Sequence, residues 1–378
     1  MRLGTAIRAL WRKLLVNKYT LVILLLLAIY SFLLGIELIS DGFKLMGKDF
    51  SNSLLATMRS PISALLIGML TTAIVQSSSC TTSIIVALCA SGILPIEVAI
   101  PAVMGANIGT TVTNSLVSFA HIKRKEDFER AFSGATVHDF FNILSVIVLL
   151  PIEIIFHPLQ NSTSLVARGF VGIGGAKIAS PIKLFTEPIA EPITDLAKWL
   201  FGGYAGIPVT IIGGTGLFLA LKVIVDTTRT IASRKFDAVL NKYLFRAAWL
   251  SFLLGLGLTA FVQSSSVTTS IVVPFVGAGL LTVEKIYPYT LGANIGTTVT
   301  AILAASALGV EVGIQIAFVH LMFNCLGIMI WYPLRKVPIG LAKKLGSFVA
   351  KKRKSAILYI VIAFYLIPGI CILIERLW

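Results

Sequence analysis

The chain has 378 residues, of which 56% are hydrophobic and only 13% are charged. This composition excludes a soluble globular domain and is typical of polytopic membrane proteins. The net charge of +15 would suggest nucleic-acid binding in a soluble protein, but here the Lys and Arg residues gather in a few short connections. Cytoplasmic loops of membrane proteins show this pattern, so we expect an all-α polytopic membrane protein with no nucleic-acid partner.

The N-terminal part of the chain predicts one membrane crossing followed by a hairpin. Residues 1–18 are basic and are expected to stay cytoplasmic, either as a short amphipathic helix on the membrane or as a solvated tail. Residues 19–40 form an apolar run long enough for one crossing, and residues 41–60 are polar enough for an external connection. Residues 61–95 contain two apolar half-lengths around a polar tip, which predicts a re-entrant helical hairpin.

A discontinuous crossing helix is expected next. The motif GANIGTTVT interrupts the apolar stretch 96–120, and Gly105 and Gly109 are expected to permit a break in the helix there. A basic cluster marks a cytoplasmic loop, after which residues 132–156 cross outward. These elements form a first repeat over residues 19–156.

The second half of the chain predicts the same elements again. Residues 157–201 are rich in Pro and Gly, and the count of crossings places this loop outside. Residues 202–334 are expected to hold a linker helix and a second repeat, with a hairpin over residues 247–281 and another discontinuous helix. Residues 335–378 contain a basic cytoplasmic loop and a last crossing, which leaves the C-terminus outside.

An internal sequence repeat supports this division. QSSSCTTS at residues 76–83 returns as QSSSVTTS at residues 263–270, and GANIGTTVT at residues 105–113 returns unchanged at residues 292–300. The second copy of each motif lies 187 positions after the first, and VHDFFN is echoed by VHLMFN at a slightly shorter offset. Loop charges give the two copies opposite orientations in the membrane. Inverted repeats of this kind place a binding site where the two copies meet.

The duplicated polar tips have the chemistry to bind an anion and a cation together. Hydroxyl and amide groups both donate and accept hydrogen bonds, half-helix N-termini favour anions, and freed carbonyls coordinate Na⁺. Neither motif contains Lys or Arg, so a bound anion could still be released. A single Ser/Thr-rich stretch can equally serve helix packing. Two nearly identical tips inside apolar surroundings favour a binding site.

Asp139 is an acidic residue inside a predicted crossing helix, and intramembrane carboxylates are by default ion or proton sites. The alternative is that Asp139 is solvated near the helix end or bonds to His138. The second copy has Leu321 at the equivalent position, so an ion site at Asp139 would exist once only. His138 and His320 are expected to be packing or hydrogen-bonding residues rather than ligands.

An enzyme is not expected. The chain has no G-x-S-x-G elbow, and both serine motifs are duplicated, which suits a symmetric pathway better than a single nucleophile. The four Cys lie in apolar segments and the four His are scattered, so neither a disulfide nor a transition-metal site is predicted.

These residues closely resemble the type II sodium/phosphate cotransporter family, whose hallmark is paired QSSS motifs in inverted repeats. The resemblance rests on both QSSS copies, both GANIGTT segments and SGATVHDFFN, and it covers nearly the whole chain. It implies sodium-driven uptake of inorganic phosphate by alternating access, with Na⁺ as coupling ion and no other cofactor. Asp139 is similar to the acidic residue of electrogenic members. The compact chain looks like a bacterial member in the cell inner membrane.

The family pattern implies two sets of site residues. The phosphate ligands are expected to be Gln76, Ser77, Ser78, Ser79, Gln263, Ser264, Ser265, Ser266 and Thr297. The sodium ligands are expected to be Gln76, Thr81, Asn107, Thr110, Asp139, Gln263, Thr268, Asn294, Thr297 and Thr298.

Two other functions stay open at this point. One is a sodium-coupled carrier of another small oxyanion, because hydroxyls and helix dipoles do not name the anion. The other is a membrane phosphate receptor that binds without transport. The expected partners are phosphate, sodium ions and the lipid bilayer, and a homodimer is left open.

Overall fold

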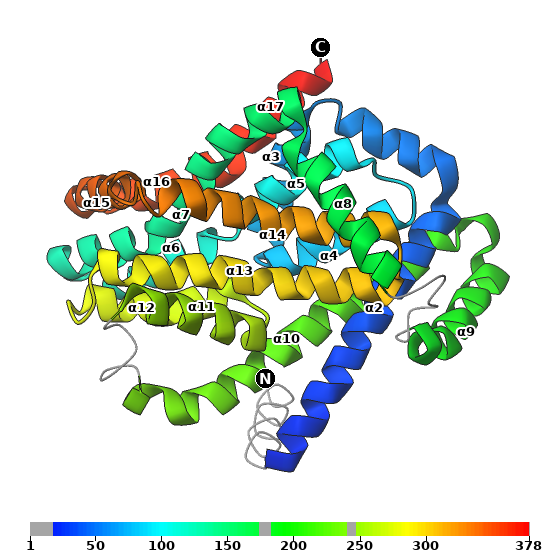
Figure 1. Ribbon diagram of the computed structural model, residues 1–378, viewed down its shortest axis with the longest axis horizontal. Helices are drawn as coiled ribbons and strands as arrows, with labels where there is room; N and C mark the ends of the chain where they lie inside the picture. Colours follow the sequence, from blue (N-terminus) through cyan, green and yellow to red (C-terminus); the bar gives the residue numbers. More distant parts are fainter. Residues whose placement is uncertain (1–17, 174–182, 240–246, 378) are drawn as a thin grey trace.

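The computed structural model describes residues 18–173, 183–239 and 247–377 (Figure 1). Every regular element in these ranges is a helix, which confirms the all-α prediction. Six of the described helices are long and apolar enough to cross a membrane, as expected of a multi-pass membrane protein. These spans are Tyr19–Met46, Ile96–His121, Lys125–Phe156, Val283–Leu308, Glu311–Trp331 and Lys354–Glu375.

The first described helix is longer than the apolar run predicts. Helix α2 extends over Lys18–Thr57, so most of the connection expected at residues 41–60 is helical, and its side of the membrane stays a prediction. Packing accompanies the extension, because Phe43 is buried and a Cβ on Gly42 would overlap the hydroxyl of Thr210. The expected N-terminal segment, residues 1–18, lies outside the described residues apart from Lys18.

Two helical hairpins are present where the repeat predicts them. The first consists of α3 (Pro61–Val75) and α4 (Ser78–Ala90), and the second of α11 (Ala248–Val262) and α12 (Ser265–Gly277). Their members have 13 to 15 residues, about 20 Å at 1.5 Å per residue, which is shorter than a bilayer core. The re-entrant arrangement of these hairpins stays a prediction.

The predicted helix break occurs in the first copy only. Two residues, Thr110 and Thr111, separate α5 (Ile96–Gly109) from α6 (Val112–Ser118). A 3-10 turn over Phe119–His121 follows α6. In the second copy α13 runs unbroken over Val283–Leu308, so the second discontinuous helix was wrongly predicted. The same nine-residue motif therefore adopts two conformations.

Close helix packing, rather than a break, is the shared role of the motif glycines. A Cβ atom on Gly105 would overlap the carbonyl of Leu65 in α3, and one on Gly292 would overlap the carbonyl of Phe252 in α11. A Cβ on Gly296 would lie 2.6 Å from the carbonyl oxygen of Leu256. Small residues permit this backbone-to-backbone contact between membrane helices. Each hairpin is thereby fixed against the helix that follows it.

The connection between the repeats is helical over most of its described residues, rather than a loop. After α7 (Lys125–Phe156) come α8 (Pro158–Ile173) and α9 (Lys183–Phe201), then a 3-10 turn over Gly202–Tyr204 and the linker helix α10 (Gly206–Val239). Helix α10 packs along α2 (Figure 1). The expected loop at residues 157–201 is thus wrong in conformation, and its side of the membrane stays a prediction.

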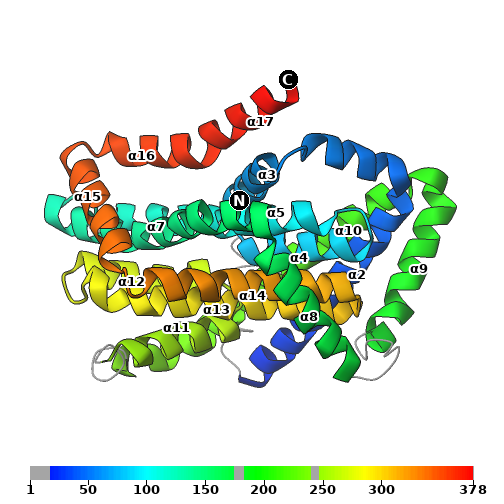
Figure 2. The same cartoon turned by 45° about the horizontal axis from the view of Figure 1, so that its top comes forward.

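The C-terminal part lies across the first repeat. Helix α14 (Glu311–Trp331) leads to α15 (Lys336–Lys351), so most of the expected basic loop is a helix that packs on α7. The last span comprises α16 (Lys354–Val361), a π-helical turn (Ile362–Leu366) and α17 (Ile367–Leu377). Figure 2 shows α16 and α17 extending from α15 over α7 toward α3.

Candidate functional site: the paired hairpin tips

Each hairpin turns at a glutamine in a left-handed conformation. Gln76 has φ 59° and ψ 26°, and Gln263 has φ 61° and ψ 24°. Such a backbone is uncommon for a residue with a side chain and persists where the surroundings require it. In both hairpins the amide N–H of the glutamine donates to the threonine four residues earlier, at 2.7 Å. The two tips have the same local geometry.

Threonines of the GANIG helices hold both glutamine side chains. The hydroxyl of Thr113 donates to Gln76 Oε1 at 2.7 Å, and that of Thr300 donates to Gln263 Oε1 at 2.6 Å. The amide nitrogens of the glutamines donate to the carbonyls of Ala73 and Ala260. Sequence reasoning missed Thr113 and Thr300 as site residues, although each is the last residue of a motif that is repeated unchanged.

A serine cap begins the second helix of each hairpin. Ser77 accepts from the amide of Cys80 at 3.2 Å, and Ser264 accepts from the amide of Val267 at 3.3 Å. These contacts are N-caps, which satisfy one of the free N–H groups at a helix start. The remaining tip serines lie in the first turn of α4 and α12 and are buried. They are Ser78, Ser79, Ser265 and Ser266.

The two tips touch each other directly. The Ser79 hydroxyl donates to the backbone carbonyl of Gln263 at 3.2 Å, across 184 positions of sequence. The Ser266 hydroxyl donates at 3.4 Å to the carbonyl of Thr110, which lies in the helix break of the first repeat. The fold therefore brings both QSSS segments and the end of the first GANIG motif to one place.

The second hairpin lies beside the helix break, and Asn114 contacts that hairpin. Its Oδ1 accepts from Ser270 at 2.9 Å and lies at the same distance from the Thr269 hydroxyl, which has a second acceptor in the Ser265 carbonyl at 2.7 Å. The second repeat has Ala301 at the position of Asn114. The corresponding hydroxyls of the first hairpin, Thr82 and Ser83, are buried without a hydrogen-bond partner among the described residues. The two halves of the site are therefore chemically different despite their similar sequences.

A buried hydrogen-bond chain connects the two repeats next to the tips. His320 Nε2 lies 3.1 Å from Asn107 Oδ1, and His138 Nε2 bonds to Asn294 Oδ1. Between them, Asn142 donates to the Asn107 carbonyl and accepts from Asn294 Nδ2, both at 2.9 Å. Because an amide oxygen only accepts, each imidazole must donate through Nε2. This agrees with the prediction that both histidines are hydrogen-bonding residues.

Asp139 is fully buried, with 0% of its surface exposed. Its Oδ2 accepts a hydrogen bond of 2.9 Å from the hydroxyl of Tyr359 in α16. Its Oδ1 has no hydrogen-bond partner among the described residues, and the side chain of Thr111 lies beside the carboxylate. His138 bonds elsewhere, so the alternative of an Asp139–His138 pair is not what the structure contains. Thr111 and Tyr359 are residues that sequence reasoning missed.

The five threonines in the predicted sodium set share one feature. Each hydroxyl donates to a backbone carbonyl three or four residues earlier in its own helix, at 2.7 to 3.2 Å. A hydroxyl has one proton, so these oxygens can only accept from, or coordinate, a further group. The residues are Thr81, Thr110, Thr268, Thr297 and Thr298.

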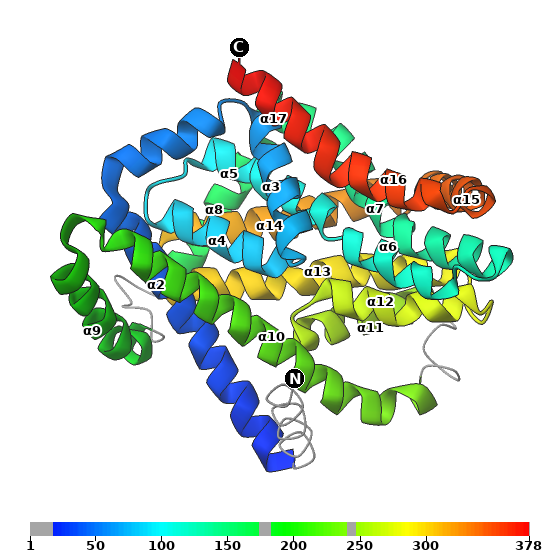
Figure 3. The ribbon, with the colours of Figure 1, turned by 180° about the vertical axis from the view of Figure 1, so that it is seen from behind.

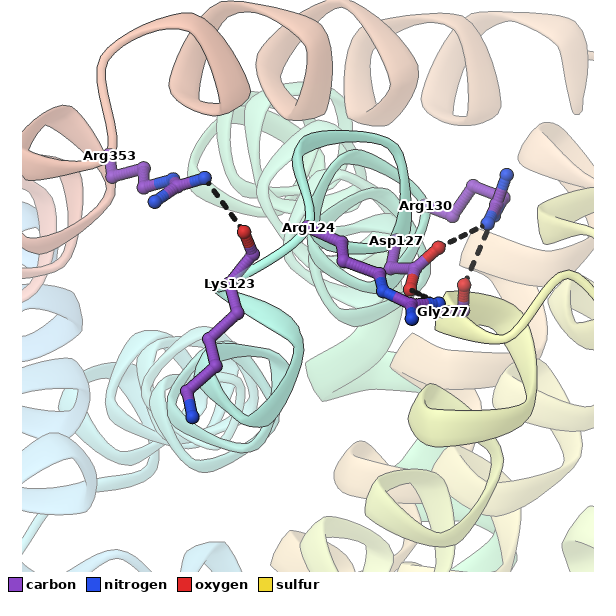
Figure 4. Close-up of polar contacts among 6 residues, drawn as sticks. All are labelled: Lys123, Arg124, Asp127, Arg130, Gly277 and Arg353. Carbon is purple, nitrogen blue, oxygen red and sulfur yellow. Dashed lines mark hydrogen bonds and ion pairs between the residues drawn. The ribbon is translucent and has the colours of Figure 1, made fainter.

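Charged residues anchor the end of the second hairpin opposite its tip. Arg130 Nε donates to the carbonyl of Gly277 at the end of α12 at 3.1 Å, while its Nη2 bonds to Asp127 at 2.7 Å (Figure 4). Arg353 at the start of α16 donates to the carbonyl of Lys123 at 3.0 Å (Figure 4). The start of α7 is thus tied both to the second hairpin and to the C-terminal helix.

The fold and the site define a multi-pass helical membrane protein with a duplicated polar centre. The model of the Na⁺/Pi-cotransporter family matches residues 31–175 and 217–351. The chain therefore belongs to the Na⁺/Pi-cotransporter family.

Three curated relatives show the extent of the similarity. Sodium-dependent phosphate transport protein 2B of Homo sapiens is 36% identical, and that of Pongo abelii is 35% identical, each over 92% of this chain and 64% of the relative. Sodium-dependent phosphate transport protein 2A of Rattus norvegicus is 34% identical over 90% of this chain and 66% of the relative. The chain thus spans somewhat less than two thirds of these relatives. No solved structure matches the chain.

Proposed function

We propose that the protein is a symporter that carries inorganic phosphate into the cell together with sodium ions. The observation that carries this proposal is the direct contact of the two QSSS tips through Ser79 and Gln263. Two helix N-termini meet there, and helix N-termini favour anions through their dipoles and free N–H groups. The names of the curated relatives, which are sodium-dependent phosphate transport proteins, support phosphate as the anion and sodium as the coupling ion.

The tip serines are the proposed phosphate donors. Ser77 and Ser264 accept from backbone amides through their oxygens, so their own protons stay free for a phosphate oxygen. Ser78 and Ser265 are the first helical residues of α4 and α12, where the dipoles add to the attraction. Ser79, Ser266, Gln76 and Gln263 complete the set and would exchange their present partners for phosphate.

The threonine hydroxyls are the proposed sodium ligands. Because their protons go to their own helices, they present lone pairs, which suit a hard cation and repel a phosphate oxygen. This argument favours sodium over phosphate for Thr297, which the family pattern implies as a ligand of both. The side-chain oxygens of Asn107 and Asn294 accept hydrogen bonds from histidines. These two residues would therefore bind sodium through Oδ1 only after the hydrogen bonds break.

We further propose electrogenic transport by alternating access, in the inner membrane, with the two hairpins as inverted re-entrant elements. The support for electrogenicity is Asp139, a buried carboxylate whose Oδ1 has no hydrogen-bond partner within the described ranges and which has Leu321 as its equivalent in the second repeat. One sodium ion bound there, in addition to those at the hairpin tips, would make each transport cycle carry net positive charge across the membrane. Lipid is the expected surrounding, because many large apolar side chains on the crossing helices are exposed.

The test is uptake of radiolabelled phosphate into proteoliposomes with an imposed sodium gradient, at zero and at inside-negative membrane potential. We expect uptake that requires sodium and rises with inside-negative potential. Ser78→Ala should lose most of this uptake, whereas Ser91→Ala, at the opposite end of the same helix and bonded only to its own turn, should retain it. Asp139→Gly should lower the charge moved per phosphate.

Three results would contradict parts of this proposal. Uptake that is indifferent to potential would remove the electrogenic step and the role of Asp139. Sodium-driven uptake of another oxyanion in place of phosphate would identify a different carrier. Sodium-dependent phosphate binding without counterflow in vesicles would identify a receptor.

A further inference from the structure

The C-terminal helix contacts the first repeat through two tyrosines. The hydroxyl of Tyr359 donates to Asp139 Oδ2, and that of Tyr365 donates to the carbonyl of Ala73 just before the first tip, both at 2.9 Å. The π-helical turn Ile362–Leu366 follows the first tyrosine and contains the second. Such turns are rare and occur frequently at functional sites. Figure 3 shows this helix crossing over α7 and α3.

The two oxygens of the Asp139 carboxylate have different surroundings. Tyr359 occupies Oδ2, whereas Oδ1 is buried with no hydrogen-bond partner among the described residues. Thr111 lies beside the carboxylate, yet its hydroxyl proton goes to the carbonyl of Ile108 at 2.9 Å. A buried carboxylate oxygen without a hydrogen-bond partner is costly unless a proton or a cation lies there. The arrangement suits a desolvated sodium ion held by Oδ1 and Thr111 Oγ1.

We propose that Tyr359 is a positioning residue for a sodium ion bound by Asp139 and Thr111, an inference that rests on the proposed function. The tyrosine hydroxyl occupies Oδ2 and fixes the carboxylate plane, so that Oδ1 faces the ion. A neutral donor suits this role, because it stabilises the negative carboxylate without the positive charge by which Lys or Arg would displace sodium. The second repeat has Leu321 in place of Asp139, so the device occurs once in the chain.

Packing holds the tyrosine ring in place before any ion binds. The ring lies edge-on to Phe132, with centroids 6.1 Å apart, and edge-on to Phe364 at 5.8 Å. Ala356, one turn earlier in α16, is fully buried in a cluster with Phe132, and Arg353 ties the start of α16 to the loop before α7 (Figure 4). A ligand held by a fixed neighbour loses less entropy on binding.

The experiment compares Tyr359→Phe with the matched control Tyr365→Phe. Both variants remove one hydroxyl from the same helix, but only the first removes it from the carboxylate. Sodium activation of phosphate uptake in proteoliposomes and equilibrium ²²Na⁺ binding to the purified protein are measured for each. We expect Tyr359→Phe to raise the half-saturating sodium concentration by about tenfold or more, as for loss of one hydrogen bond to a charged group. The maximal rate at saturating sodium should be retained. Tyr365→Phe should leave the sodium affinity unchanged, because the Ala73 carbonyl keeps its hydrogen bond from Gln76.

A double-mutant cycle with Asp139→Asn separates positioning from general packing. If Tyr359 acts through the carboxylate, adding Tyr359→Phe to Asp139→Asn should cause no further loss of sodium affinity. Independent, multiplying effects would overturn the inference, as would equal shifts in the two tyrosine variants. If Tyr359→Phe alone fails to fold, recovery of folding in the double variant supports the pairing, and failure of the double variant overturns it.

The binding measurement also separates this inference from the proposed function. If the wild-type protein takes up no phosphate with sodium, the symport proposal fails. The comparison of ²²Na⁺ binding between Tyr359→Phe and Tyr365→Phe still decides whether Tyr359 positions a sodium ligand. Absence of ²²Na⁺ binding to the wild-type protein overturns the inference itself.

Discussion

Substitution of Gly213 by alanine should push α2 and α10 apart. These two helices pack along each other, and a Cβ on Gly213 would lie 2.8 Å from the carbonyl oxygen of Gly35 and 2.8 Å from the amide nitrogen of Ile39. Both neighbours are backbone atoms, which cannot rotate away as a side chain can. Ordinary contact begins at 3.4 Å, so the helices must separate locally by more than half an ångström. Overpacking of this size costs about 1–3 kcal/mol.

The adjacent residue provides the control, because nothing lies within 4 Å of a Cβ on Gly214. Alanine stabilises the middle of a helix by roughly 0.5–1 kcal/mol relative to glycine, so Gly214→Ala should be neutral or stabilising. The midpoints of thermal unfolding in lipid nanodiscs should therefore move in opposite directions for Gly213→Ala and Gly214→Ala. A Gly213→Ala variant as stable as Gly214→Ala would refute close helix contact at this position.

Two further substitutions test contacts around the hairpin tips. Asn114→Ala should destabilise the protein by about 1 kcal/mol, because the Ser270 hydroxyl loses its acceptor, whereas Thr269 keeps the carbonyl of Ser265; an unchanged unfolding midpoint would show that another group satisfies Ser270. Thr300→Val should raise the half-saturating phosphate concentration several-fold, since Gln263 loses the donor that holds its side chain; if the sodium activation curve moves while the phosphate curve does not, Gln263 serves the cation instead.

The hairpins could be predicted from sequence because their signals are local and duplicated. Half-length apolar segments flank eight polar or small residues twice, and both copies fold into helix, turn and helix at the expected places. The length of an apolar run did not predict where a helix ends when the helix continues into polar sequence. Helix α2 continues past its apolar run along α9 and α10, where Phe43 is buried and Gly42 lies against Thr210, and no local signal reveals these partners.

Part of the polar centre could also be predicted from the sequence. The QSSS motifs, GANIG motifs, Asp139 and the histidines of the third repeated motif could be singled out, since polar residues inside apolar segments and unchanged repeats stand out. Tyr359 gave no such signal, because a tyrosine in a membrane helix is ordinary. Its contact with Asp139 spans 220 positions and depends on the path of the last helix.

The internal repeat shows which features the sequence alone determined and which it did not. The sequence determined the all-helical membrane class, the two hairpins and the residues at their tips. These features follow from the lengths of the apolar segments and from the polar residues that interrupt them. The tertiary structure decided the conformation of GANIGTTVT, which is broken in one copy and continuous in the other with identical residues. Asn114, at the position that Ala301 has in the second repeat, contacts Thr269 and Ser270 of the second hairpin just after this break. Backbone conformation there depends on partners distant in sequence, which local propensity cannot encode.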